Sequence, residues 1–137
     1  MPKISEYFIA SYGKIKEPFG EFAGGETPFV SSGDFDNGVV GFFDIQPTNK
    51  DVITVARTGS IGSSFYHPYS CAINSDCIVL EQKQKMTQEQ MLAIVTLLRK
   101  NIFRYSYARK VTPQRLLDTM IPKNFNGYLS PSVKNSL

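Results

Sequence analysis

The sequence predicts a mixed α+β domain, in which a small, twisted, mostly antiparallel β-sheet with hairpins in the first half packs with one amphipathic helix and a short C-terminal helix. The chain has 137 residues, 42% hydrophobic and 20% charged. This is the length of a single domain with enough apolar material for a core. Short apolar runs separated by turns fill the first 80 residues, and apolar residues then recur at helical spacing.

Five apolar segments of the first half are predicted strands. Asn37-Gly38 separates the first two, and Asn-Gly is a strong hairpin signal because both residues tolerate a positive φ. The tight turn Arg57-Thr58-Gly59-Ser60 separates the next two. The predicted strands are residues 27–32, 39–43, 51–56, 61–66 and 77–80.

Two helices are predicted in the second half. The first, about 15 residues long, begins with the capping box Thr87-Gln88-Glu89-Gln90. Its apolar stripe consists of Met91, Ile94, Val95, Leu98 and Ile102. The second begins at the N-cap Thr112 and ends before Pro122. We therefore expect one domain over residues 1–123 and a polar tail over residues 124–137.

The charge is unevenly distributed along the chain. The net charge is +3, but residues 1–80 carry five basic and nine acidic side chains, a balance of −4, and residues 81–137 carry ten basic and three acidic, a balance of +7. Such asymmetry indicates an anionic partner for the second half, most commonly nucleic acid. A helix with a basic solvent face is the alternative.

The composition excludes several classes of protein. Two cysteines and a single histidine, His67, exclude most zinc frameworks and any disulfide scaffold. His67 lies four residues from Cys71, which is compatible with a thiol–imidazole pair, but His67-Pro68 is more typical of an exposed turn. Neither a phosphate-binding glycine loop nor a methyltransferase motif is present, and no cofactor is predicted. With no apolar run long enough for a membrane span and no signal-peptide pattern, we expect a cytoplasmic protein.

One enzyme motif is present. Glu81-Gln82-Lys83 follows a predicted strand, as in PD-(D/E)xK nucleases, where two carboxylates hold Mg²⁺ and the lysine positions water. Asp51 or Asp76 would supply the first carboxylate. The same residues also suit a polar linker before the helix cap, so a small nuclease remains an alternative. A protein-interaction module that binds through the basic helix is another.

Two segments suit contact with DNA. Residues 99–110 contain five cations and three aromatic side chains, which can neutralise phosphates and donate hydrogen bonds to the backbone. The turn Arg57-Thr58-Gly59-Ser60 presents an arginine and two hydroxyls at a loop tip. An ordinary hairpin turn would look the same.

The order of the motifs resembles the target-recognition domain of type I restriction–modification specificity subunits, and most of all the variety in type IIB, BcgI-like systems. The resemblance extends to about Pro122. The motifs, in order, are Tyr12-Gly13-Lys14, residues 27–32, residues 36–39, residues 53–62, Phe65-Tyr66, residues 105–110 and Ile121-Pro122.

The resemblance implies a non-catalytic domain that binds double-stranded DNA and delivers it to an adenine methyltransferase subunit, which flips the base. The implied DNA-binding residues are Arg57, Thr58, Ser60, Ser31, Ser32, Tyr66, Arg104, Tyr107, Arg109, Lys110 and Lys123. Among these, Arg57 and Arg109 are expected to contact base edges. Lys110, Arg104 and Lys123 are expected to contact phosphates.

The chain departs from the family pattern in length. Complete specificity subunits hold two such domains joined by long helices, whereas this sequence shows one domain and no long heptad pattern. It is therefore expected to be a half-subunit or a truncated subunit, with a second specificity half-subunit as a further partner.

Overall fold

The computed structural model describes residues 2–100 and 110–122. Its strands are β1 (Phe8–Tyr12), β2 (Gly24–Val30), β3 (Val39–Phe43), β4 (Asn49–Ala56), β5 (Ser64–Ile73) and β6 (Cys77–Gln82). Its helices are α1 (Gln88–Lys100) and α2 (Pro113–Leu117), with short 3-10 turns η1 (Ile4–Glu6), η2 (Phe19–Glu21) and η3 (Asp36–Gly38). Within the described residues, no helix has the length and apolar content needed to cross a membrane.

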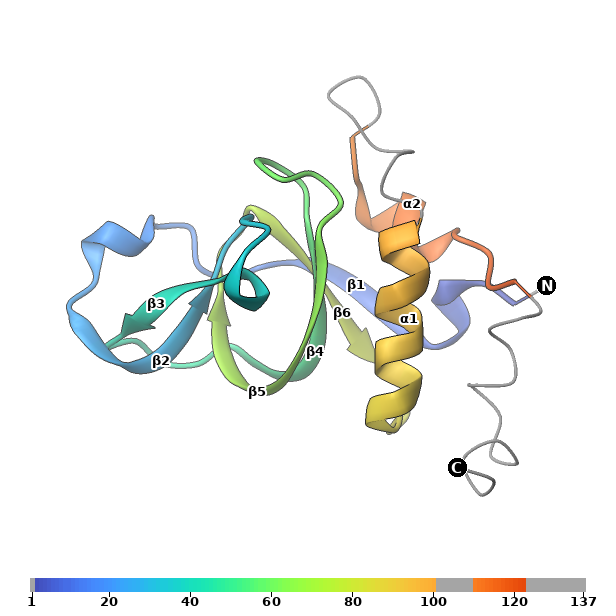
Figure 1. Cartoon of the computed structure of the whole chain (residues 1–137), viewed down its shortest axis with the longest axis horizontal. Helices are drawn as coiled ribbons and strands as arrows, with labels where there is room; N and C mark the ends of the chain where they lie inside the picture. The colour runs from blue at the N-terminus through green and yellow to red at the C-terminus, as the bar shows by residue number, and fades with distance from the viewer. Residues whose placement is uncertain (1, 101–109, 123–137) are drawn as a thin grey trace.

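The six strands form one sheet in the order β1-β6-β4-β5-β2-β3 (Figure 1). Every neighbouring pair is antiparallel except β2 and β5, which run parallel through Phe29 and Val30. Helix α1 packs beside the β4–β5–β6 part of the sheet, and the β2–β3 hairpin extends away from it (Figure 1). The predicted fold class is confirmed.

Successive side chains of the central strands point to opposite faces of the sheet, so these strands contribute to two separate groups of core residues. On β4, Ile53 and Val55 belong to the main core that α1 covers, whereas Val52 belongs to a smaller core on the opposite face. Strand β6 alternates in the same way. Both faces of these strands are therefore buried, which explains why β4 and β6 read as nearly continuous apolar runs.

The predicted turn and helix starts are confirmed. Asn37 and Gly38 have φ values of 57° and 76° in the turn between β2 and β3. At the start of α1, the Gln90 backbone N–H donates to Thr87 Oγ1 (3.2 Å) and the Thr87 N–H donates to Gln90 Oε1 (2.9 Å), a complete capping box. At α2, Thr112 Oγ1 accepts from the Arg115 N–H (3.2 Å). Ile102 and the predicted tail lie outside the described residues.

The prediction that His67 lies in an exposed turn is wrong. His67 is fully buried inside β5, which is longer than the predicted strand, and its Nε2 lies 2.7 Å from Thr54 Oγ1. The pairing of β4 with β5 shifts register here, from Lys50–Ser70 to Val52–His67, so Pro68 sits in the bulge where no ladder hydrogen bond is lost. A bulge that depends on a distant partner strand has no local sequence signal.

The buried imidazole makes stability depend on pH. Burial lowers the pKa of His67 from 6.5 to about 4. Between pH 6.5 and 4 the imidazole is therefore protonated in the unfolded chain but neutral in the folded chain. The stability that the neutral imidazole contributes is fully present above pH 6.5 and is lost as the pH falls to 4. We expect the free energy of unfolding to fall by about 3 kcal/mol across that window. Urea unfolding of the native chain and of His67→Gln at several pH values measures this, and equal slopes for both between pH 7 and 5 would contradict it.

Candidate nucleic-acid interface

Three loops meet at the end of the sheet where β4 ends. They are residues 31–33 after β2, residues 57–62 between β4 and β5, and residues 74–76 between β5 and β6, and together we call them the loop platform. The Ser60 N–H donates to Ser32 O (3.1 Å), and Thr58 Oγ1 donates to Ser32 Oγ (3.3 Å). The loop between β4 and β5 projects beyond the sheet on the side where α1 ends (Figure 1). Segments far apart in sequence thus present their side chains on one surface.

Asp76 joins the three loops. Its Oδ2 accepts from Ser31 Oγ (2.5 Å) and from the Ser32 N–H (3.2 Å). Its backbone oxygen accepts from the Arg57 N–H (3.0 Å). The other carboxylate oxygen, Oδ1, is buried without a hydrogen-bond partner among the described residues. Only one half of this carboxylate therefore supports the loops.

Gly59 allows the close contact between two of the loops. Its φ is +57°, and a Cβ atom at this position would lie 2.8 Å from Ser32 Oγ and 3.1 Å from Ser32 O. Only glycine combines this backbone conformation with this approach at little cost. The glycine in the Arg-Thr-Gly-Ser turn thus lets the loop tip lie against residue 32.

Arg57 is held from two sides. Its Nε donates to Ser75 O (2.8 Å), and its Cζ lies 4.6 Å from the centroid of the Tyr12 ring. Its two terminal Nη atoms have no hydrogen-bond partner among the described residues, and the residue is half-buried. The guanidinium is thus fixed in orientation while its outer edge stays available for a bidentate contact.

The structure brings five of the predicted site residues together. Arg57, Thr58, Ser60, Ser31 and Ser32 all lie in the loop platform, with Thr58 exposed and the other four half-buried. Ser31 donates its hydroxyl hydrogen to Asp76. Among these residues, the terminal nitrogens of Arg57 and the Ser60 hydroxyl have no hydrogen-bond partner in the described part of the chain, whereas the Thr58 hydroxyl donates to Ser32 Oγ.

The remaining predicted residues lie elsewhere. Tyr66 is only 9% exposed, and its hydroxyl donates to Asp51, far from the platform end of β4. Burial, followed by this contact with Asp51, raises the pKa of Tyr66. Lys110 is exposed, and its backbone oxygen accepts from Arg115 Nη1 (3.3 Å). Arg104, Tyr107, Arg109 and Lys123 lie outside the described residues.

Asp51, Glu81 and Lys83 of the nuclease alternative line one pocket, but Asp76 lies apart from them and Asp51 is already engaged. Asp76 precedes β6 and Glu81 lies near the end of that strand, so they are at opposite ends. Asp51 binds Lys85 Nζ at 2.5 Å and the Tyr66 hydroxyl. Burial alone would raise the pKa of Asp51, but hydrogen bonds from Lys85 and Tyr66 lower it overall. In the part of the chain that the structure describes, no three His, Cys, Asp or Glu side chains form a group suited to a metal ion.

Reasoning from the sequence missed two residues that build the platform. Tyr12 supports Arg57 from β1, and Asp76 links the loops, although the sequence suggested Asp76 only as a metal ligand. Both residues contact partners that are distant from them in the sequence. Tyr12 belongs to the first motif of the family resemblance, which is the one signal that points to it.

Comparisons with known proteins identify the family of the chain. The model of the type I restriction modification DNA specificity domain matches residues 8–122. The chain is 26% identical over 123 residues to the specificity subunit S.BcgI of the type II restriction enzyme BgcI from Heyndrickxia coagulans, covering 87% of this chain and 36% of that protein. The comparisons give no support to a nuclease.

Solved structures show the same fold. The S subunit of a type I restriction-modification system from M. genitalium matches with a TM-score of 0.68 at 21% identity, over 86% of this chain and 32% of that one. The HsdS subunit from Thermoanaerobacter tengcongensis matches with a TM-score of 0.62 at 15% identity, over 98% and 37%. The chain thus spans about a third of the length of the relatives it matches.

Proposed function

We propose that this chain, which belongs to the type I restriction modification DNA specificity domain family, reads one part of a split double-stranded DNA target with its loop platform. The family match covers β1 through α2, the same residues that build the platform. The DNA contact itself, and the residues that make it, are our proposal.

The orientation of Arg57 is the observation that carries this proposal. Arg57 Nε donates to Ser75 O and its Cζ lies over the Tyr12 ring, which leaves the two terminal Nη groups without a hydrogen-bond partner among the described residues. A guanidinium with both Nη groups unused can pair with O6 and N7 of guanine in the major groove. Thr58 and Ser60, beside it at the loop tip, supply hydroxyls for neighbouring bases or phosphates.

The basic second half of the chain supplies the phosphate contacts. Lys110 is exposed, and we assign it to the DNA backbone. Arg104 and Lys123 are assigned to phosphates, Arg109 to a base edge, and Tyr107 to the DNA surface, as the sequence predicts. Ser31 and Ser32 support the loops and make secondary contacts. The buried Tyr66 stabilises the sheet in this proposal, because its hydroxyl is engaged by Asp51.

The chemistry belongs to other subunits in this proposal. The chain is a non-catalytic recognition domain that brings an adenine methyltransferase subunit to its target, where that enzyme flips the base. This domain reads one part of the target, and a second recognition domain, on the same subunit or on a second specificity half-subunit, reads the other part. A solved relative whose structure addresses complex assembly of the type I R-M system matches with a TM-score of 0.62.

DNA binding by matched variants tests the proposal. We expect the chain to bind random-sequence duplex at low salt and to select a short motif from a randomised library, measured by fluorescence anisotropy and sequencing. Arg57→Ala should weaken binding to the selected site by about 1–3 kcal/mol and relax selection at one position. Lys110→Ala should weaken binding to all sequences equally and flatten the salt dependence.

Lys50→Ala is the matched control. Lys50 is an exposed cation near the start of β4, whereas Arg57 follows the end of that strand, about 20 Å away. We expect it to leave selection unchanged. If no duplex binds at low salt, or if Arg57→Ala behaves like Lys50→Ala, the proposal is wrong.

A further inference from the structure

The β2–β3 hairpin and the segment before it carry a concentrated negative charge. Residues 17–30 and 34–44, which we call the acidic arm, hold six acidic side chains, and residues 17–49 contain no lysine or arginine. All six are exposed: Glu17, Glu21, Glu26, Asp34, Asp36 and Asp44. A surface of this charge repels DNA phosphates. It therefore serves something other than DNA contact.

The arm also exposes apolar side chains. Four of the eight large hydrophobic residues that are exposed in the described part of the chain lie on it, among them Phe35 at 82% and Phe42 at 59%. Strand β3 is the last strand of the sheet, with a neighbour on one side. Two of the four, Val40 and Phe42, lie on this edge strand, and exposed apolar side chains on a sheet edge are typical of a protein-binding surface.

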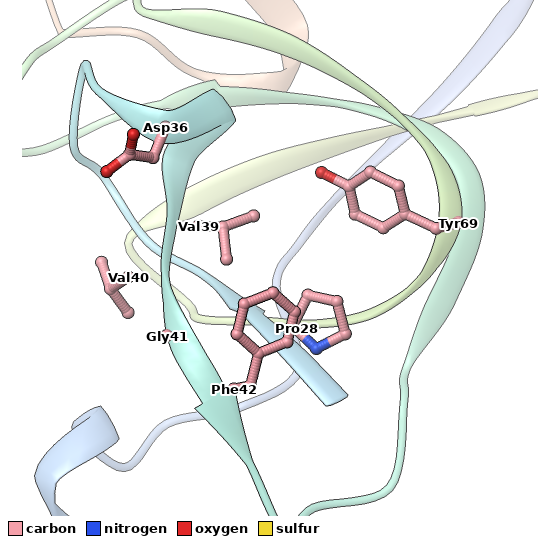
Figure 2. A pocket seen from close by; sticks show the side chains of 7 residues that line it. All are labelled: Pro28, Asp36, Val39, Val40, Gly41, Phe42 and Tyr69. Carbon is pink, nitrogen blue, oxygen red and sulfur yellow. The ribbon is translucent and has the colours of Figure 1, made fainter. Parts of the chain in front are cut away.

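A groove of about 530 Å³ runs along the arm. Val39, Val40 and Phe42 line it from β3, Pro28 from β2 and Tyr69 from β5, and Asp36 lies at its margin (Figure 2). The groove combines an apolar floor with one acidic lining residue, Asp36. A ligand that matches this groove therefore carries apolar side chains and positive charge.

The arm is held in shape without a partner. The Phe43 ring centroid lies 5.8 Å from that of Phe29 and 5.9 Å from that of Phe19, forming an aromatic cluster behind the exposed edge. Asn37 Nδ2 donates to Tyr69 Oη (2.9 Å) and to Tyr66 O (3.0 Å), which ties the hairpin turn to β5. A preformed surface binds without the entropic cost of ordering it.

We infer that the acidic arm is a docking surface for a cationic amphipathic segment of another protein. Apolar side chains of that segment lie in the groove, and its lysine or arginine side chains lie over Asp36 and the other exposed acidic side chains of the arm. A second copy of the chain is disfavoured because a two-fold interface through the arm would place the six acidic side chains opposite their own copies. The inference does not depend on the proposed DNA recognition.

A defined peptide tests the inference. The probe is a labelled 12-residue peptide that alternates lysine with valine, titrated with the full chain and followed by fluorescence anisotropy. Two control peptides carry glutamate in place of lysine, or serine in place of valine. We expect the probe to bind and both controls to bind at least about tenfold more weakly. The glutamate peptide lacks the positive charge that matches the acidic side chains, and the serine peptide lacks the apolar side chains that fill the groove.

Variants of the arm locate the site. Phe42→Ser should weaken probe binding about tenfold by removing the exposed ring from the groove. Asp36→Asn combined with Asp44→Asn should weaken it and reduce its salt dependence while leaving the fold intact, since both side chains are exposed. Leu92→Ser is the matched control, because Leu92 is similarly exposed, at 52%, but lies on α1.

Three outcomes would overturn the inference. The first is failure of the probe to bind, or equal binding of the serine peptide, which shows simple charge attraction. The second is unchanged binding by both arm variants. The third is a dimer in analytical ultracentrifugation that Phe42→Ser dissociates, which makes a second copy the occupant. DNA binding measured on the same variants should stay at the native level, so failure of DNA recognition and failure of arm docking are told apart.

Discussion

Asp76→Ala is expected to dismantle the loop platform. The substitution removes the acceptor of two hydrogen bonds to a charged group, from Ser31 Oγ and the Ser32 N–H. Each such bond contributes about 1.5–3 kcal/mol, so we expect a loss of about 3–5 kcal/mol in the free energy of unfolding. Because the loop of Ser31 and Ser32 then separates from the loop of Arg57, affinity for a selected DNA site should fall about a hundredfold. Urea unfolding and anisotropy titration measure the two effects.

Asp76→Asn is the matched control for this prediction. Its amide oxygen can take the place of Oδ2 and accept both bonds, while its amide nitrogen takes the place of Oδ1, which has no partner among the described residues. We expect Asn to lose less stability and less DNA affinity than Ala, because it keeps the two bonds to residues 31 and 32 although its buried amide N–H groups find no acceptor. Equal loss in both variants would mean that the negative charge, not the hydrogen bonding to residues 31 and 32, is what the loops require.

The elements that the sequence predicts have local signals, whereas β1 (Phe8–Tyr12) is not among the five predicted strands. The Asn37-Gly38 turn, the Thr87–Gln90 capping box and the Thr112-Pro113 helix start each depend on residues within four positions of one another. His67 was misplaced because its burial depends on the bulge that β5 forms against β4. The parallel pairing of β2 with β5 also joins strands that the local pattern does not connect.

The sequence predicts which loops form the candidate site, but not the contacts that hold these loops together. The turn of Arg57 was identified by its residue types, and the structure places Ser31 and Ser32 against it. The support of Arg57 by Tyr12 crosses 45 positions of sequence, and no periodicity indicates it. Asp76 illustrates the same limit, because a carboxylate after a strand suits a metal ligand and a loop anchor equally well until its neighbours are known.

Gly13→Ala is expected to be the most destabilising single substitution considered. A Cβ atom on Gly13 would lie 2.0 Å from Asn74 O and 2.7 Å from Ile73 O, both backbone atoms that cannot rotate away. The end of β1 must then separate from the loop at residues 74–76, which breaks the bond from the Gly13 N–H to Cys77 O (2.9 Å) and moves Asp76. We expect a loss of more than about 4 kcal/mol and a fall in Tm of about 15 °C.

Gly20→Ala provides the matched comparison, because a Cβ atom on Gly20 would meet nothing within 4 Å. Its effect should stay within about 0.5 kcal/mol. Differential scanning calorimetry of both variants measures the contrast, and anisotropy titration shows whether DNA affinity falls with Tm. A Gly13→Ala chain that melts like the native protein would show that β1 does not approach the platform this closely, and the support of Arg57 by the neighbouring Tyr12 would have to be abandoned with it.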